Sequence, residues 1–304
     1  MKLSEAQIAA FHENGYLHFP EGVLSPDDLR PVIAEYEAVI ERRAQRLQAE
    51  GKIRALYADQ PLPRRMASIA QDAPEIATEL DIRFTRDRAM FTFLHCPTLL
   101  DLAESLIGPE LLCSPIQHVR AVPPEQAAMR NPRSHHWHQD AGTVQPEADG
   151  QIIATMWIPL FDVPLDGGCL ELLPGSHRLG LRRHLVNGEI QVDPREVPDL
   201  TPAPLPTKAG GLILFHPMMI HRSQPNQTDR VRWSLDLRYQ DSAKPTGRPF
   251  LPGFVVRSRA HPQTVLHDYE HWNTLWTEAM APLQDIPYEQ YLKMAYRWPA
   301  GEPA

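Results

Sequence analysis

The chain has 304 residues, of which 42% are hydrophobic and 22% are charged, and this balance excludes an intrinsically disordered protein. Its formal net charge of −8 argues against a broad surface for nucleic acid or anionic membranes. No apolar run approaches the roughly 20 residues of a membrane helix, and the polar first residues are unlike a signal peptide. We therefore expect a cytoplasmic protein with no nucleic-acid or membrane partner.

The first third of the chain predicts helices. Ser4 and Gln7 form a capping box that starts a short helix. Ser25, followed by a proline and two aspartates, starts a longer one. A third helix is predicted over 97–107, where a Gly-Pro pair follows it. The 31 prolines nevertheless make an all-helical bundle improbable.

Short β-rich runs broken by Gly, Pro, Asn and Asp follow from about residue 111. They lie at about 112–122, 136–141, 152–160, 169–173, 211–216, 219–224 and 231–239. This spacing indicates a sandwich or barrel. The simplest interpretation is a single domain over 1–304, in which helices of 1–110 pack on a β core of about 111–240, followed by a C-terminal segment 241–304.

A cluster of histidine and aspartate is the first candidate for chemistry. If the segment is extended, its period of two puts His136, His138 and Asp140 on one face, with neighbours roughly 6–7 Å apart. An H-x-D triplet is common by chance, but His221 lies in another β-rich run. Two histidines and one carboxylate can hold iron(II) and leave positions open for O₂ and a bidentate co-substrate. His216 is a rival ligand, although a proline follows it at an expected strand end.

The run 231–239 alternates strictly between apolar and polar residues. An amphipathic strand with a wet polar face is one interpretation. The other is a binding site, because the guanidinium of Arg232 and the hydroxyl of Ser234 lie on the same face and suit a carboxylate.

Taken together, these features resemble the phytanoyl-CoA dioxygenase family of iron(II)/2-oxoglutarate oxygenases. The resemblance rests on HWHQD at 136–140, on GCLELLPGSHR at 168–178, and on His221 with Arg232. It implies a mainly β protein with flanking α-helices, whose core is a double-stranded β-helix, a jelly-roll or cupin-like barrel.

The same resemblance implies a metal and catalytic centre of His138, Asp140 and His221, which would bind Fe(II). His177 lies in an expected tight turn and is left out of the site.

The resemblance also implies a site for the co-substrate 2-oxoglutarate. In it, Arg232 pairs with the distal carboxylate and Ser234 assists. Trp157 matches a tryptophan beside the co-substrate, and Gln117 on the preceding strand is a further candidate for the same pocket.

The implied activity is that of a dioxygenase that uses O₂ and 2-oxoglutarate to hydroxylate, or alternatively desaturate, a small metabolite or natural-product intermediate, with release of succinate and CO₂. Asp140 disfavours halogenation, because related halogenases lack that carboxylate ligand. One alternative is a cupin-type metalloenzyme that adds His136 and uses no 2-oxoglutarate, but no glutamate follows at 141–144. A non-catalytic ligand-binding barrel is the other.

The sequence does not identify the substrate. Its pocket is expected in 54–90, the loop 123–134 and the segment after Asp241. Three arginines in the first region could meet an anionic substrate or form an exposed charged segment: Arg83, Arg86 and Arg88. The aromatic stripe Tyr269, Trp272 and Trp276 is typical of a core or an interface, and the oligomeric state stays open.

Overall fold

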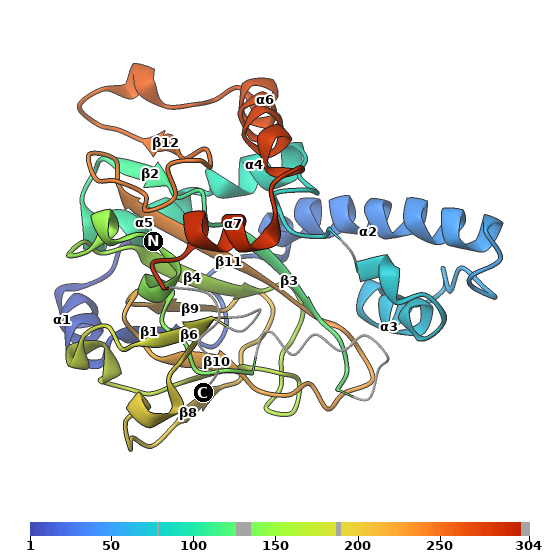
Figure 1. Ribbon diagram of the computed structural model, residues 1–304, viewed down its shortest axis with the longest axis horizontal. Helices are drawn as coiled ribbons and strands as arrows, with labels where there is room; N and C mark the ends of the chain where they lie inside the picture. Colours follow the sequence, from blue (N-terminus) through green and yellow to red (C-terminus); the bar gives the residue numbers. More distant parts are fainter. Residues whose placement is uncertain (78, 126–134, 187–189, 299–304) are drawn as a thin grey trace.

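The computed structural model describes residues 1–77, 79–125, 135–186 and 190–298 (Figure 1). Its larger sheet has seven strands in the order β1-β9-β4-β11-β2-β12, and β3 also pairs with β11. The strands are β1 (Tyr16–Phe19), β2 (Leu111–Cys113), β3 (His118–Val122), β4 (Ala154–Pro159), β9 (Leu212–Phe215), β11 (Arg232–Asp241) and β12 (Phe254–Arg257). All pairings in this sheet are antiparallel.

A smaller antiparallel sheet faces the inner side of the larger one. It consists of β10 (His221–Ser223), β5 (Leu170–Leu172) and β8 (Ala203–Leu205), and a separate hairpin pairs β6 (His184–Val186) with β7 (Ile190–Val192). Trp157 and Phe215 of the larger sheet share one apolar cluster with Leu170, Leu172 and Leu205 of the smaller sheet. The two sheets therefore form a sandwich of antiparallel sheets, to which β1 and β12 contribute from outside the expected range 111–240.

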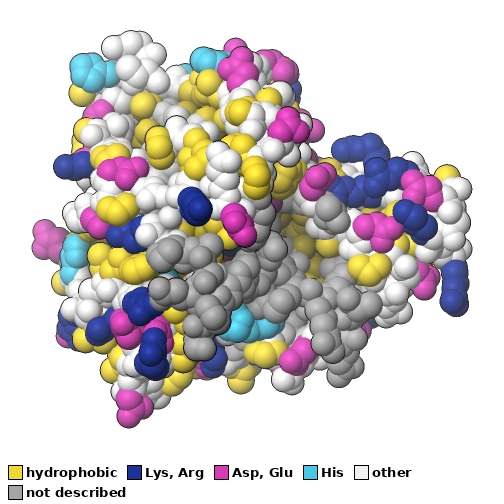
Figure 2. All heavy atoms as spheres, viewed as in Figure 1, with side chains coloured by type: hydrophobic (Ala, Val, Ile, Leu, Met, Phe, Trp, Pro, Cys, Tyr) yellow, Lys and Arg dark blue, Asp and Glu magenta, His cyan; other side chains and the backbone are white. Residues whose placement is uncertain are grey.

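Helices flank this core. They are α1 (Glu5–Asn14), α2 (Pro26–Ala49), α3 (Leu62–Asp72), α4 (Arg88–Leu94), α5 (Pro97–Ile107), α6 (Tyr269–Met280) and α7 (Tyr288–Ala295). The capping box at Ser4 is formed as predicted, Ser25 starts α2 as predicted and also forms a capping box with Asp28, and α5 ends before Gly108. Figure 1 shows α2 extending away from the sheets, and basic side chains gather over its far end in Figure 2. Among the described helices, none has both the length and the apolar character that a bilayer crossing needs.

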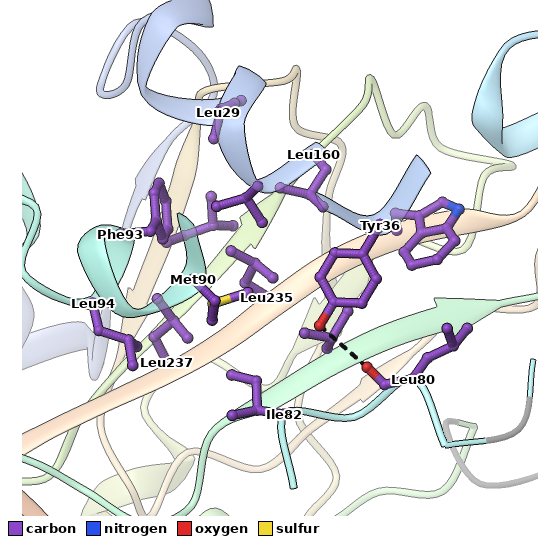
Figure 3. Packing of buried hydrophobic residues seen from close by; sticks show 14 of the residues in the cluster. Leu29, Tyr36, Leu80, Ile82, Met90, Phe93, Leu94, Leu160, Leu235 and Leu237 are labelled. Carbon is purple, nitrogen blue, oxygen red and sulfur yellow. Dashed lines mark hydrogen bonds between the residues drawn. The ribbon is translucent and has the colours of Figure 1, made fainter. Parts of the chain in front are cut away.

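The main core lies between the outer face of the larger sheet and the helices. The apolar face of β11, which includes Leu235 and Leu237, packs against α2 and α4 (Figure 3). Tyr36 of α2 is fully buried there, and its hydroxyl donates to the carbonyl oxygen of Leu80 over 3.2 Å. The predicted alternation of β11 is thus confirmed: its apolar side supports the fold, and its polar side faces the smaller sheet.

The aromatic stripe of α6 belongs to the same core. Trp272 and Trp276 are buried, and the ring of Trp272 lies 5.2 Å from that of Phe91 in α4. The core interpretation of this stripe is therefore correct.

One predicted strand is wrong. Residues 136–141 form no strand beyond a single bridge between His138 and His221, and a 3-10 helix starts at Asp140. The reason is that backbone N–H groups in this segment donate to acceptors that do not belong to a neighbouring strand. The N–H of Gln139 donates to the ring of His184, and that of Ala141 to the carbonyl of Pro217.

Candidate metal and co-substrate site

Three side chains with metal-binding atoms meet between the two sheets. The ligand atoms of His138, Asp140 and His221 all lie within 4.8 Å of one another. The backbones of His138 and His221 exchange two hydrogen bonds of 3.0 Å, which fixes their spacing. Nε2 of His221 lies 4.0 Å from Oδ1 of Asp140. The structure thus brings together the predicted triad, although its first two members lie on an irregular segment instead of a strand.

Both imidazole rings are oriented by the main chain. Nδ1 of His138 lies 3.0 Å from the carbonyl of His136, and Nδ1 of His221 lies 2.9 Å from that of Met219. A carbonyl can only accept, so each Nδ1 carries the hydrogen and each Nε2 keeps its lone pair for a metal. Burial, together with the neighbouring His221, lowers the pKa of His138 to about 3, and burial also lowers the pKa of His221. Both rings are therefore neutral at pH 7, as metal binding requires.

The carboxylate of Asp140 is held by two partners. Arg238 donates from Nη2 to Oδ1 over 2.8 Å and from Nε to Oδ2 over 3.1 Å, and the hydroxyl of Thr155 donates to Oδ2 over 2.8 Å. Burial alone would raise the pKa of Asp140, but Arg238 and the two histidines hold it well below its usual range. Asp140 is therefore ionised, and its orientation is fixed before any metal binds.

Gln117 lies beneath Arg238 and not beside Arg232. It lies between β2 and β3 and not on a strand, and its Oε1 accepts from the backbone N–H of Arg238 over 3.0 Å. Its Nε2 donates to the carbonyls of Ser114 and Arg238. Its amide group is thus occupied in supporting Arg238.

A cavity of about 290 Å³ is lined by His138 and His221 of the triad and by Arg232. The guanidinium of Arg232 is buried and donates from Nη1 to the hydroxyl of Ser234 over 2.8 Å and from Nη2 to that of Ser223 over 3.1 Å. Trp157 also lines the cavity, with the Arg232 guanidinium 5.5 Å from its ring centre. Arg232, Ser234 and Trp157 are therefore gathered as predicted.

The chemistry of this cavity suits a carboxylate. No carboxylate of the described residues forms an ion pair with Arg232. Two buried N–H donors, Nε of Arg232 and Nε1 of Trp157, have no hydrogen-bond acceptor among these residues. Burial lowers the pKa of Arg232 to about 10, so it stays a cation at pH 7. A buried cation with unpaired N–H donors is costly, and an anion removes that cost.

The rival ligands lie elsewhere. His136 is exposed, and Nδ1 of His216 accepts from the backbone N–H of Met218 over 3.1 Å. The ring of His216 packs against His177, whose Nε2 lies 3.0 Å from the carbonyl of His12. Within the described residues, the one group of three or more metal-binding side chains is His138, Asp140 and His221. The four-ligand cupin alternative therefore lacks its fourth ligand in this part of the chain.

Sequence reasoning missed Ser223, Thr155 and Arg238 as members of the site. Ser223 lies two positions after His221 on β10, which places both side chains on one face, and this spacing could have identified it. Arg238 lies on the polar face of β11 with Arg232 and Ser234, but nothing local indicates that it pairs with Asp140.

Of the three arginines at 83–88, Arg83 alone lines the described cavities next to the triad. Arg86 donates to the hydroxyl of Thr277, and Arg88 pairs with Glu270. Most of the loop 123–134 that was expected to contribute to the substrate pocket, residues 126–134, lies outside the described residues.

The chain is similar to curated proteins, among them the following two. The phytanoyl-CoA dioxygenase domain-containing protein 1 of Mus musculus is 31% identical over 125 residues, which are 38% of this chain and 41% of that relative, so this match spans less than half of the relative's length. The peroxisomal phytanoyl-CoA dioxygenase of Rattus norvegicus is 23% identical over 251 residues, 79% of this chain and 69% of that relative.

Solved structures share the fold. The apo structure of the non-heme monooxygenase ThoJ has a TM-score of 0.56 at 22% identity and covers 92% of this chain and 99% of its own. The epimerase SnoN in complex with Fe³⁺, alpha ketoglutarate and nogalamycin RO has a TM-score of 0.52 at 25% identity. The match covers 81% of this chain and 88% of SnoN. These matches confirm the predicted jelly-roll fold and agree with the predicted iron and 2-oxoglutarate.

A family model for phytanoyl-CoA dioxygenase matches residues 11–234, which include the triad, Trp157, Arg232 and Ser234. The predicted enzyme class, a 2-oxoglutarate-dependent non-heme iron oxygenase, is thereby confirmed at the level of the family. The chain belongs to the phytanoyl-CoA dioxygenase family.

Proposed function

We propose that this chain is an iron(II)- and 2-oxoglutarate-dependent dioxygenase that hydroxylates or desaturates a small organic molecule and releases succinate and CO₂. The observation that carries the proposal is the triad of two neutral imidazoles and one carboxylate next to a buried guanidinium that has no counter-ion among the described residues. That combination fits a divalent metal and a dicarboxylate in adjacent positions.

His138, Asp140 and His221 would hold the metal, and iron would supply the activation of O₂ coupled to oxidative decarboxylation of the co-substrate. The two carbonyl-anchored imidazoles keep their Nε2 lone pairs available. Arg238 keeps Asp140 ionised and restricts the rotation of its carboxylate.

Arg232 would bind the distal carboxylate of 2-oxoglutarate, and the hydroxyls of Ser234 and Ser223 fix the direction of its guanidinium. The apolar side chains of Leu170 and Phe215 line the same cavity and reduce the water around the bound diacid. A dry cavity strengthens the ion pair and limits turnover without substrate.

The test is an anaerobic titration of the Fe(II)-loaded protein with 2-oxoglutarate, followed by visible absorption. We expect a weak charge-transfer band in the wild-type protein and in His136→Ala, because His136 is exposed and lies outside the triad. We expect no band in His221→Ala. A wild-type protein without a band would contradict the proposal and favour the cupin alternative, and loss of the band in His136→Ala would mean that His136 belongs to the metal site.

The proposed substrate is a small molecule, and oxygen-dependent succinate release would separate a catalyst from a ligand-binding barrel. The cytoplasmic location, the single-domain organisation and the absence of nucleic-acid partners stay predictions from the sequence.

A further inference from the structure

A second cavity, of about 230 Å³, adjoins the triad, and Arg232 does not line it. Its lining includes His138, Asp140 and Arg238. Arg248 lines it too, together with Tyr291 of α7 and Tyr296, the residue that follows this helix. Apolar side chains complete the lining: Pro115, Ile116, Ile190, Leu251 and Leu292. The volume is below the roughly 300–1,000 Å³ of pockets for drug-sized ligands, so it suits a small molecule.

The charges around this cavity are unbalanced. Three of its arginines have carboxylate partners: Arg83 pairs with Asp81, Arg120 with Asp236, and Arg238 with Asp140. Arg248 is the exception. It is only 6% exposed, and no carboxylate in the described part of the chain forms an ion pair with it.

The contacts of Arg248 are to neutral groups. Its Nε donates to the carbonyl of Thr143 over 3.0 Å and its Nη2 donates to the same oxygen over 2.5 Å. Its guanidinium lies 5.1 Å from the ring centre of Tyr296. A neutral carbonyl and an aromatic face compensate a buried cation only in part, so the position favours an anion.

Tyr291 adds a donor beside this cation. Its hydroxyl oxygen accepts from Nη1 of Arg83 over 2.9 Å, which leaves the hydroxyl hydrogen for another acceptor. Arg83, Arg248 and Tyr291 line the same cavity, so an acceptor there can meet the hydroxyl and the guanidinium together.

We propose that this cavity binds the primary substrate and that this substrate is a small monocarboxylic acid with an apolar body. Its carboxylate pairs with Arg248 and accepts from Tyr291, and its body lies along the apolar wall towards His138 and Asp140. The inference rests on the proposed function. It gives the two buried arginines separate ligands, since Arg232 holds the diacid and Arg248 holds the substrate.

Calorimetry on the protein loaded with Fe(II) and saturating 2-oxoglutarate under anaerobic conditions tests this. The probes are hexanoate, benzoate and 3-phenylpropanoate, each compared with its primary amide. We expect at least one acid to bind tenfold or more tightly than its amide, because only the acid carries the charge. Saturating 2-oxoglutarate keeps the probes away from Arg232.

Three variants assign the effect. Arg248→Met should remove the preference for the acid, and Tyr291→Phe, which deletes one hydroxyl, should weaken acid binding several-fold. Arg88→Met is the control, because Arg88 is exposed and pairs with Glu270 away from the cavity. All three variants should show the charge-transfer band, with the same 2-oxoglutarate concentration at half-saturation as the wild type. A band of this kind also verifies that each variant folds.

Equal binding of every acid and its amide, or a preference that survives in Arg248→Met, would overturn the inference. So would a 2-oxoglutarate midpoint that rises in Arg248→Met as much as in Arg232→Met, since Arg248 would then belong to the co-substrate site. In each of these cases the wild-type band is intact and the proposed function stands. A missing wild-type band would instead contradict the proposed function itself.

Discussion

Arg232 illustrates how single residues determine this site. Its guanidinium is buried, and hydrogen bonds to Ser234 and Ser223 fix its orientation. It can therefore offer a carboxylate two parallel N–H donors as well as a positive charge. Arg232→Lys keeps the charge but loses the fork. We expect the 2-oxoglutarate concentration at half-saturation of the anaerobic band to rise about tenfold, and about a hundredfold in Arg232→Met. An unchanged midpoint in Arg232→Met would show that the diacid binds elsewhere.

Thr155 tests the support of the metal-binding carboxylate at the same scale. Its hydroxyl donates to Oδ2 of Asp140, and Thr155→Val removes this hydrogen bond at almost constant volume. Loss of such an outer partner should weaken the binding of Fe(II) or Co(II) by about 10- to 100-fold. Thr274→Val on α6 is the control, because its hydroxyl bonds only its own helix, and its metal affinity should equal that of the wild type. Equal affinities of the two variants would contradict a supporting role for Thr155.

At the scale of elements, Gly15 connects α1 to β1. Its φ of 82° lies in the left-handed region, and an added Cβ would lie 2.3 Å from Nδ1 of His177 and 2.5 Å from the methyl group of Met219. Gly22 has a similar φ of 77°, but an added Cβ would meet no heavy atom of the described residues within 4 Å. The two glycines therefore separate backbone strain from crowding.

Gly22→Ala should lower the free energy of unfolding by about 1 kcal/mol, which is the cost of the left-handed conformation alone. Gly15→Ala should lower it by about 2–4 kcal/mol, because overpacking adds to the same backbone cost. Urea unfolding of both variants checks this difference. Equal losses would mean that His177 and Met219 move aside without cost.

The segment 136–141 shows the limit of pattern reasoning for elements. Its composition, a short β-rich run, predicts a strand, yet the backbone N–H of Gln139 donates to the ring of His184, which lies 45 positions away. Strand formation depends on a partner with free backbone groups, and this segment finds one at a single bridge. The predicted ligands His138 and His221 still lie side by side, because the single bridge joins these two residues.

For the molecule as a whole, Glu35 links stability to pH. It lies on α2, where one carboxylate oxygen accepts from the N–H of Met90 over 3.1 Å and the other has no partner among the described residues. Burial, and to a smaller extent Asp87, raises the pKa of Glu35 to about 7. Between about pH 4.5 and pH 7 the native state holds a proton that the unfolded state has lost, so this group loses its stabilising contribution as pH rises.

Glu35→Gln removes that titration but keeps an acceptor for Met90. We expect the variant to gain about 1–2 kcal/mol over the wild type between pH 5 and pH 8, an amount reduced for partial exposure of the carboxyl. Urea unfolding of both proteins at pH 5 and pH 8 gives the difference between their free energies of unfolding at each pH. The buried histidines are the same in both proteins, so their contribution cancels in this difference. A difference independent of pH would place the pKa of Glu35 near its ordinary value.

The sequence by itself determined the features that depend on near neighbours. The capping boxes at Ser4 and Ser25 and the apolar face of β11 follow from residues a few positions apart. The blocks 136–140 and 168–178, together with His221 and Arg232, are enough to indicate the family. Only the tertiary structure decided the pairing of Asp140 with Arg238, which lie 98 positions apart, and the isolation of Arg248 from any described carboxylate. Which charges meet depends on strand order and register, and these are set by the packing of the whole core.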